Sequence, residues 1–217
     1  MKTDAQLKKD VLAELNWEPS VNATKIGVEV SDGVVTLAGH VDSYGEKWHA
    51  ERAAQRVGGV KALAVEMDVT IPGSAERTDT DIAHSAEQAL QWVSYIPKDA
   101  IKIQVEKGWI TLSGKVDWDY QRQNASSALR YLVGVKGVTD NVELKSRTSS
   151  TGVRAGIEAA LKRYSDAEGQ DISVDVQDGD VTLTGTVHSL WARELARESA
   201  WNSPGVRHVI DNLNVSF

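Results

Sequence analysis

Apolar residues recur along the chain at two spacings that alternate in a fixed order. Leu7, Val11 and Leu15 are four residues apart, which is typical of one buried face of an amphipathic helix. Residues 26–41 then alternate between apolar and polar side chains, which is typical of two half-buried strands. A second helical spacing follows over residues 50–57, where Ala is frequent. These small side chains predict a helix that packs closely on the sheet.

The same order of spacings occurs three times, anchored by a motif of the form Gly-x-(Val/Ile)-Thr-Leu-x-Gly. The first motif glycines are Gly33, Gly108 and Gly179, which lie 75 and 71 residues apart, and these offsets also relate three later turn glycines. Agreement at two distant anchors indicates tandem repetition of one unit. The motif glycines, which we interpret as structural, are Gly33, Gly39, Gly59, Gly108, Gly114, Gly134, Gly179, Gly185 and Gly205.

Each unit is predicted to run helix, strand, strand, helix, strand. Asp-Gly or Lys-Gly between the first two strands predicts a tight antiparallel hairpin. The strand after the second helix should lie parallel to its neighbour, because a strand, helix, strand connection crosses over. The fold class is therefore α+β, with three tandem α-β-β-α-β modules, each a small mixed three-stranded sheet with two helices packed on one face. We expect the first module at 1–72, the second at 76–146 and the third at 149–217.

Helix starts are also marked in the sequence. Thr3, Thr78 and Ser149 are equivalent N-cap candidates, and the spacings Thr3 to Gln6 and Ser43 to Glu46 predict capping boxes. Such boxes satisfy backbone N–H groups that a helix start otherwise leaves without partners.

At these residues the sequence resembles the BON domain family, whose modules share the α-β-β-α-β order and the Gly-x-Val-Thr-Leu-x-Gly segment. The resemblance covers nearly the whole chain. It implies non-catalytic binding modules associated with phospholipid membranes, envelope maintenance and osmotic stress, and in some members with potassium or other ligands. The resemblance also implies that the motif glycines have a structural role in the fold.

The charge balance and the absence of Cys exclude several classes of function. The chain has 24 Lys and Arg against 31 Asp and Glu, a formal net charge of −7, so no overall positive field favours nucleic acid. The middle stretch 73–147 is the exception, with 10 basic and 10 acidic residues. There is no Cys, which excludes disulfides, thiolate metal sites and cysteine nucleophiles. The N-terminal residues show no apolar signal segment, so we expect a cytoplasmic protein, or a periplasmic one if a native signal was removed.

No sequence motif indicates catalysis, a metal site or a cofactor. The five His residues share no repeat position and no metal-ligand spacing, and no nucleophile elbow, Walker loop or dinucleotide motif occurs. We therefore expect no enzyme.

Aromatic residues are the main candidates for contact with a membrane or a partner. Trp17 and Trp92 share one repeat position, rotated about 200° from the apolar stripe of the first helix, and should be partly exposed. A second aromatic position falls where the second helix begins. The candidate contact residues are Trp17, Tyr44, Trp92, Tyr95, Trp109, Trp118, Tyr120 and Trp191, with Lys98, Lys102, Lys107 and Lys115 expected near Trp92, Tyr95 and Trp109.

Three interpretations of these residues stay open. Packing within or between modules is favoured over ligand binding by about two to one, since aromatic rings often fill such contacts. As a ligand, a phospholipid surface is expected from the family resemblance, with the second module as its site. The alternatives are a protein-interaction scaffold and a module that senses a monovalent or divalent cation.

Overall fold

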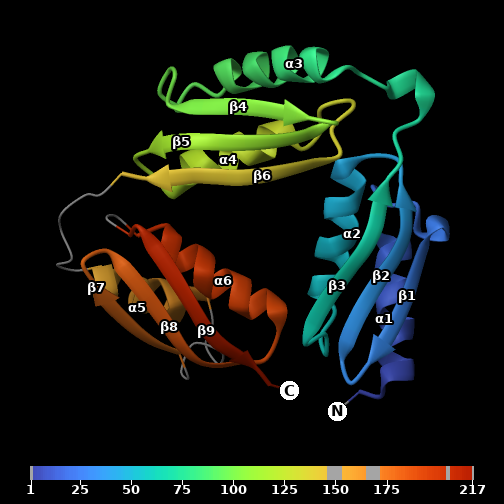
Figure 1. Cartoon of the computed structure of the whole chain (residues 1–217). Helices are drawn as coiled ribbons and strands as arrows, with labels where there is room; N and C mark the ends of the chain where they lie inside the picture. Colours follow the sequence, from blue (N-terminus) through green and yellow to red (C-terminus); the bar gives the residue numbers. More distant parts are fainter. Residues whose placement is uncertain (1, 146–152, 165–171, 204–205, 217) are drawn as a thin grey trace.

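The computed structural model describes residues 2–145, 153–164, 172–203 and 206–216 of the chain. Three copies of one order of elements follow each other, each with its own sheet (Figure 1). The first module contains α1 (Asp4–Trp17), η1 (Ala23–Lys25), β1 (Ile26–Ser31), β2 (Val34–Val41), α2 (Tyr44–Arg56) and β3 (Ala62–Val69). After η2 (Gly73–Ala75), the second contains α3 (Asp79–Trp92), β4 (Ile101–Glu106), β5 (Trp109–Val116), α4 (Asp119–Leu129) and β6 (Gly137–Leu144). The third contains α5 (Val153–Tyr164), β7 (Ile172–Gln177), β8 (Asp180–Val187), α6 (Leu190–Trp201) and β9 (His208–Val215).

The middle strand of each sheet is the second in sequence. β2 pairs antiparallel with β1 and parallel with β3, and the other two sheets repeat this arrangement. The hairpin between β1 and β2 turns at Asp32 and Gly33, whose φ angles are 52° and 82°. Two successive positive φ values match a type I′ turn, whose twist suits paired strands. The predicted α+β fold with mixed sheets is confirmed.

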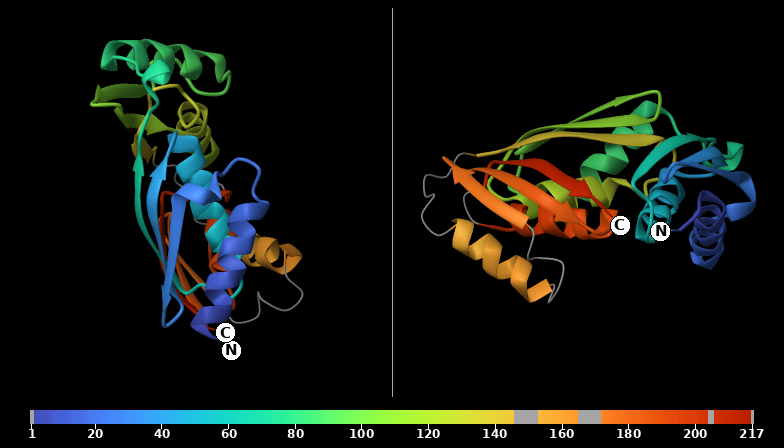
Figure 2. Two further views of the ribbon diagram at one scale, coloured as in Figure 1. Left: turned by 90° about the vertical axis from the view of Figure 1, so that its right-hand side faces the viewer. Right: turned by 90° about the horizontal axis from the view of Figure 1, so that it is seen from below.

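The two helices of a module cover one face of its sheet, as the first module shows (Figure 2). Leu7, Val11 and Leu15 of α1 are at most 2% exposed, as their spacing predicts. Ala50, Ala53 and Ala54 of α2 are fully buried, so the small side chains do bring that helix close to the sheet. Each module has its own apolar cluster on this face. The side chain of Leu161 in α5, which the repeat offsets make the counterpart of Leu15, lies outside the described residues.

The helix caps agree only in part with the sequence. The Thr3 hydroxyl accepts from Gln6 N and the Ser43 hydroxyl from Glu46 N, so both are N-caps. The reciprocal halves of the predicted capping boxes are wrong. The Gln6 side chain donates to Asp10 instead, and the Glu46 carboxylate accepts from the backbone N–H of Asn22 and Asp42.

A complete capping box occurs at α3 instead, between Thr78 and Asp81. Ser149, the equivalent residue in the third module, lies outside the described residues.

An aspartate in the first turn of the first helix fixes the hairpin of the same module. The Asp4 carboxylate accepts from Asp32 N at 2.8 Å and from Gly33 N at 3.1 Å. Asp79 does the same for Lys107 N at 2.7 Å and Gly108 N at 2.8 Å. The hairpin therefore lies beside the start of the first helix, and the end of that helix lies at the other end of the module.

Candidate functional site

The two tryptophans at the end of the first helix are the most exposed large side chains of the described chain. Trp17 is 82% exposed and Trp92 is 88% exposed. Each is the last residue of its helix, two positions after a stripe residue that faces the core. The helical rotation thus turns both indoles toward solvent, as expected from their spacing. The equivalent position in the third module is Arg163, whose side chain lies outside the description.

A hollow lined by both polar and apolar side chains opens between the end of α3 and strand β4. Its volume is about 570 Å³. Gln91 and Val93, the residues on either side of Trp92 in sequence, both line it, together with Lys98. Its other lining residues are Glu87, Leu90, Ser94, Ile96, Pro97, Asp99, Ile101 and Ile103.

The residues that line the hollow from β4 are less protected than their counterparts in the first module. Ile101 and Ile103 are only half-buried, whereas Ile26 and Val28 of β1 are buried. The second module therefore combines an exposed indole, accessible aliphatic side chains and one lysine within a short segment.

Tyr95 attaches this segment to the start of α4. Its ring lies against that of Tyr120 with 5.6 Å between centroids, in an edge-to-face arrangement. The Gln121 side chain donates to the Tyr95 carbonyl at 2.6 Å, and Gln121 also accepts from the backbone N–H of Asp117 and Trp118. Trp118 is half-buried as the N-cap residue of α4. These aromatic residues thus order the loop that follows Trp92.

Trp109 lies elsewhere, on the open face of the second sheet. It pairs with Gly137 of the neighbouring strand β6, and its Nε1 donates to Thr139 Oγ1 at 2.8 Å. The ring covers Gly137 so closely that a Cβ there would overlap it. The indole is therefore held across the sheet, although 47% of the residue is exposed.

The four candidate lysines, which were expected near Trp92, Tyr95 and Trp109, are spread over the second module. Only Lys98 lines the hollow next to Trp92. Lys102 and Lys115 alternate with core-facing residues and so lie on the open sheet face, where Lys115 pairs with Glu143 at 2.9 Å. Lys107 is in the hairpin held by Asp79. Since α3 has 14 residues, Lys107 lies about 20 Å from Trp92.

Tyr44 and Trp191 mediate contacts between modules. Tyr44 begins α2 but packs against the apolar cluster of the second module. Burial raises the pKa of its hydroxyl, and the charge of Glu51 adds to this shift. Trp191 begins α6 and lies under Arg52 of α2, with 5.1 Å from the guanidinium carbon to the ring centroid. These two aromatic residues therefore pack between modules, which is the first of the three interpretations.

Sequence reasoning missed several residues at these contacts. Trp48 faces Arg130 of the second module at 3.8 Å, and His49 Nε2 lies 3.1 Å from the Tyr131 hydroxyl. A signal was present in the repeat alignment, because Gly45 occupies the position where the other modules have Tyr120 and Trp191. A small residue where its repeats are large suggests that something else fills the space.

Two acidic side chains lie at these contacts, of which Asp119 is buried and Glu51 is half-buried. Burial raises the pKa of Glu51, and Lys47 and Arg130 partly oppose the shift. Burial likewise raises the pKa of Asp119, which is 2% exposed and accepts from Arg122 and Gln123. In the described ranges, no three His, Asp or Glu side chains converge to hold a metal ion. No helix in these ranges is long and apolar enough to cross a bilayer.

Comparisons with known proteins identify the family to which the chain belongs. The chain is 28% identical to osmotically-inducible protein Y of Escherichia coli over 146 residues, which cover 65% of this chain and 73% of that protein. Among solved structures, the C-terminal domain of CdsD, a structural protein of the type III secretion system of Chlamydia trachomatis, is 15% identical with complete coverage of both chains and a TM-score of 0.27. The periplasmic domain of the inner-membrane protein PrgH from S. typhimurium is 16% identical, covers 94% of this chain and 99% of that one, and has a TM-score of 0.23. The BON domain matches residues 3–71, 78–146 and 149–216, so the chain belongs to the BON domain family, with three copies in tandem.

Proposed function

We propose that this protein is a non-catalytic, osmotic-stress-associated binding protein that attaches peripherally to phospholipid membranes through its second module. The observation that carries the proposal is the 88% exposure of Trp92, whose two neighbours in sequence line a surface hollow. Indole rings favour the headgroup level of a bilayer, where their apolar body and polar N–H are both accommodated. Lys98 lines the same hollow and can face an anionic headgroup.

The attachment through one module is weak. Transfer of one large apolar side chain contributes about 1.5–3 kcal/mol, and a lysine near an anionic leaflet contributes about 1 kcal/mol. The sum of about 2.5–4 kcal/mol corresponds to a dissociation constant of about 1–15 mM. Trp17 of the first module offers a second anchor of the same kind, and two anchors on one chain strengthen each other through effective concentration.

Vesicle co-sedimentation across a salt series tests the proposal. The full chain should bind anionic phosphatidylglycerol vesicles more than neutral phosphatidylcholine vesicles, and salt should weaken the difference. Trp92→Ala should remove most binding to both, whereas Lys98→Ala should remove only the anionic preference. Lys102→Ala is the matched control, because Lys102 lies on the other face of the sheet and should leave binding unchanged. Equal sedimentation of wild type and Trp92→Ala would refute the role of the indole.

A protein-interaction scaffold is the second candidate, and Trp109 favours it. This indole lies flat on an open sheet face, fixed by its bond to Thr139, and so presents a rigid aromatic surface. Rigid aromatic side chains are frequent at the centres of protein interfaces. A partner bound there should be retained at high salt and lost in Trp109→Ala, while vesicle binding is unaffected.

A further inference from the structure

The second helices of the three modules meet at their ends, and the same repeat positions recur at each meeting. By the repeat offsets, Tyr44, Asp119 and Leu190 are equivalent first residues of α2, α4 and α6. At the other end, Gln55, Arg130 and Trp201 are equivalent. We name the first five residues of each of these helices its start surface, and its last five residues with the two that follow them its end surface.

The start surface of the first module docks on the end surface of the second. Tyr44 packs into the second apolar cluster, and Trp48 lies against Arg130 at 3.8 Å. Gly45 faces Tyr131, and a Cβ on Gly45 would lie 2.8 Å from the ring carbon Cδ1. The absence of a side chain at this position is what allows Tyr131 to approach the helix.

The start surface of the third module docks on the end surface of the first. Leu190, the counterpart of Tyr44, packs against the apolar cluster of the first module. Trp191, the counterpart of Gly45, lies under the guanidinium of Arg52 at 5.1 Å. Here a large residue fills the space that Tyr131 fills at the first contact. The two modules are far apart in sequence, so this contact is not a consequence of a short linker.

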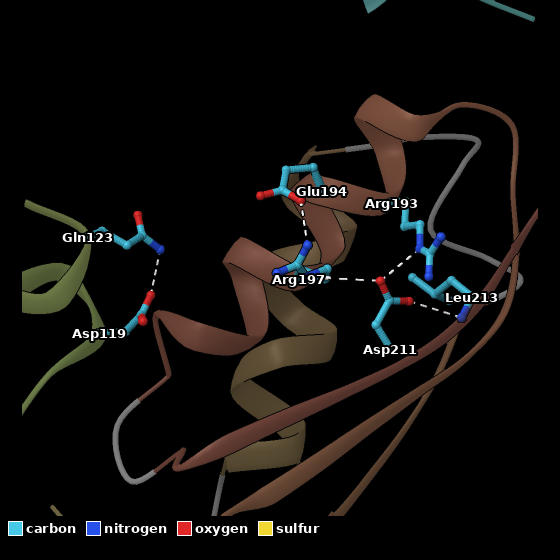
Figure 3. Close-up of polar contacts among 7 residues, drawn as sticks. All are labelled: Asp119, Gln123, Arg193, Glu194, Arg197, Asp211 and Leu213. Atoms are coloured by element: carbon cyan, nitrogen blue, oxygen red, sulfur yellow. Dashed lines mark hydrogen bonds and ion pairs between the residues drawn. The ribbon is translucent and has the colours of Figure 1, made fainter. Parts of the chain in front are cut away.

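The start surface of the second module meets the end surface of the third. The guanidinium carbon of Arg122 lies 4.4 Å above the ring centroid of Trp201, the counterpart of Arg130. Asp119 and Gln123 lie beside the end of α6 (Figure 3), and Asp119 is 2% exposed. Like the other two contacts, this one places an arginine guanidinium against a tryptophan ring of another module.

We propose that the three modules form a closed ring in which each start surface docks on the end surface of another module. First docks on second, second on third, and third on first, which is the closure that a head-to-tail contact reaches at three units. The partner that a start surface recognises is therefore another BON module of this chain. In the closed ring, each start surface is covered by the end surface of another module. The ends of the first helices, with Trp17 and Trp92, stay free for other ligands.

Gly45→Leu tests the first contact. The new side chain would collide with Tyr131 and undock the first and second modules, without harming the α2 helix itself. Gly156→Leu is the matched control, since Gly156 is also helical and has no atom within 4 Å of a Cβ. Tyr131→Ala should restore docking in the Gly45→Leu background.

The readout is the distance distribution between two spin labels, which the cysteine-free chain allows at chosen positions such as Ser20→Cys and Asp175→Cys. These positions lie in the first and third modules, so the measurement reports ring closure. The wild-type chain and Gly156→Leu should give one narrow distribution. Leu190→Asp opens the third contact and Gly45→Leu opens the first, so the two substitutions together release the first module from both neighbours and should broaden the distribution at least twofold.

A broad distribution in the wild-type chain would overturn the ring. So would a narrow distribution that persists when Leu190→Asp and Gly45→Leu are combined, because the first module would then be held by something other than these contacts. Circular dichroism of each variant separates undocking from unfolding, since an undocked module keeps its helical and strand signal.

Discussion

Substitution of the second motif glycine by alanine should strongly destabilise the module that contains it. Gly114 of β5 has φ +134°, a conformation that L side chains rarely adopt. A Cβ at this position would also lie well inside van der Waals contact with the Ala100 carbonyl oxygen, which belongs to the backbone and cannot turn away. Gly39 in the first module has the same geometry against the Lys25 carbonyl.

Backbone strain and steric overlap both lower the free energy of unfolding, and the magnitude of each can be estimated. The strained backbone costs about 1–3 kcal/mol, and the shift needed to relieve the overlap costs about 1–3 kcal/mol more. We therefore expect Gly114→Ala to lower the free energy of unfolding by about 4 kcal/mol, a large share of the 5–15 kcal/mol typical of whole domains.

Urea denaturation followed by far-UV circular dichroism measures this loss. With a slope of about 2 kcal/mol per molar urea, the transition of the second module should move about 2 M lower. Gly156→Ala is the control, because nothing lies near its Cβ and the helix should gain up to about 1 kcal/mol. A Gly114→Ala midpoint within experimental error of wild type would refute the reasoning, as would an equal loss in Gly156→Ala.

Three further changes have defined outcomes. Asp79→Ala removes the acceptor of two hairpin N–H groups and should cost about 2 kcal/mol in urea denaturation, whereas the exposed Glu87→Ala should cost little. Because burial raises the folded pKa of Asp119 above 3.8, wild type should gain stability relative to Asp119→Asn as the pH falls through that raised pKa, and thermal melts at several pH values would detect the difference. Gly137→Ala should displace the Trp109 ring and reduce the near-UV circular dichroism signal.

The fold could be predicted because its determinants are local and occur three times. Spacing alone placed Leu7, Val11 and Leu15 in the core, and Asp32-Gly33 at a tight hairpin. Hydrogen-bond partners were less predictable. Glu46 has the spacing of a capping box, yet its carboxylate binds the N–H of Asn22, a residue 24 positions away that only the folded chain brings close.

The sequence predicts that individual residues of the candidate site are exposed, but it does not predict which of them lie close together. Helical rotation sufficed to expose Trp92, but the position of Lys107 depends on the Asp79 bond that ties the hairpin to the start of α3. The orientation of Trp109 depends on the β5–β6 register, which places Gly137 beside it. Contacts such as Trp48 with Arg130 join surfaces of separate modules, and no periodicity within one module encodes them.

The order of strands in each sheet has a consequence for association between molecules. Because the hairpin's second strand is central, every sheet has two edges, and bare edges are templates on which strands of other molecules can add. The first edge strand of each module carries a charged, exposed side chain: Glu29, Lys102 and Asp175. Burying such a charge against a second sheet is costly. The first edge of each sheet is thereby protected against edge-to-edge aggregation under crowding, when the loss of water concentrates every protein in a cell.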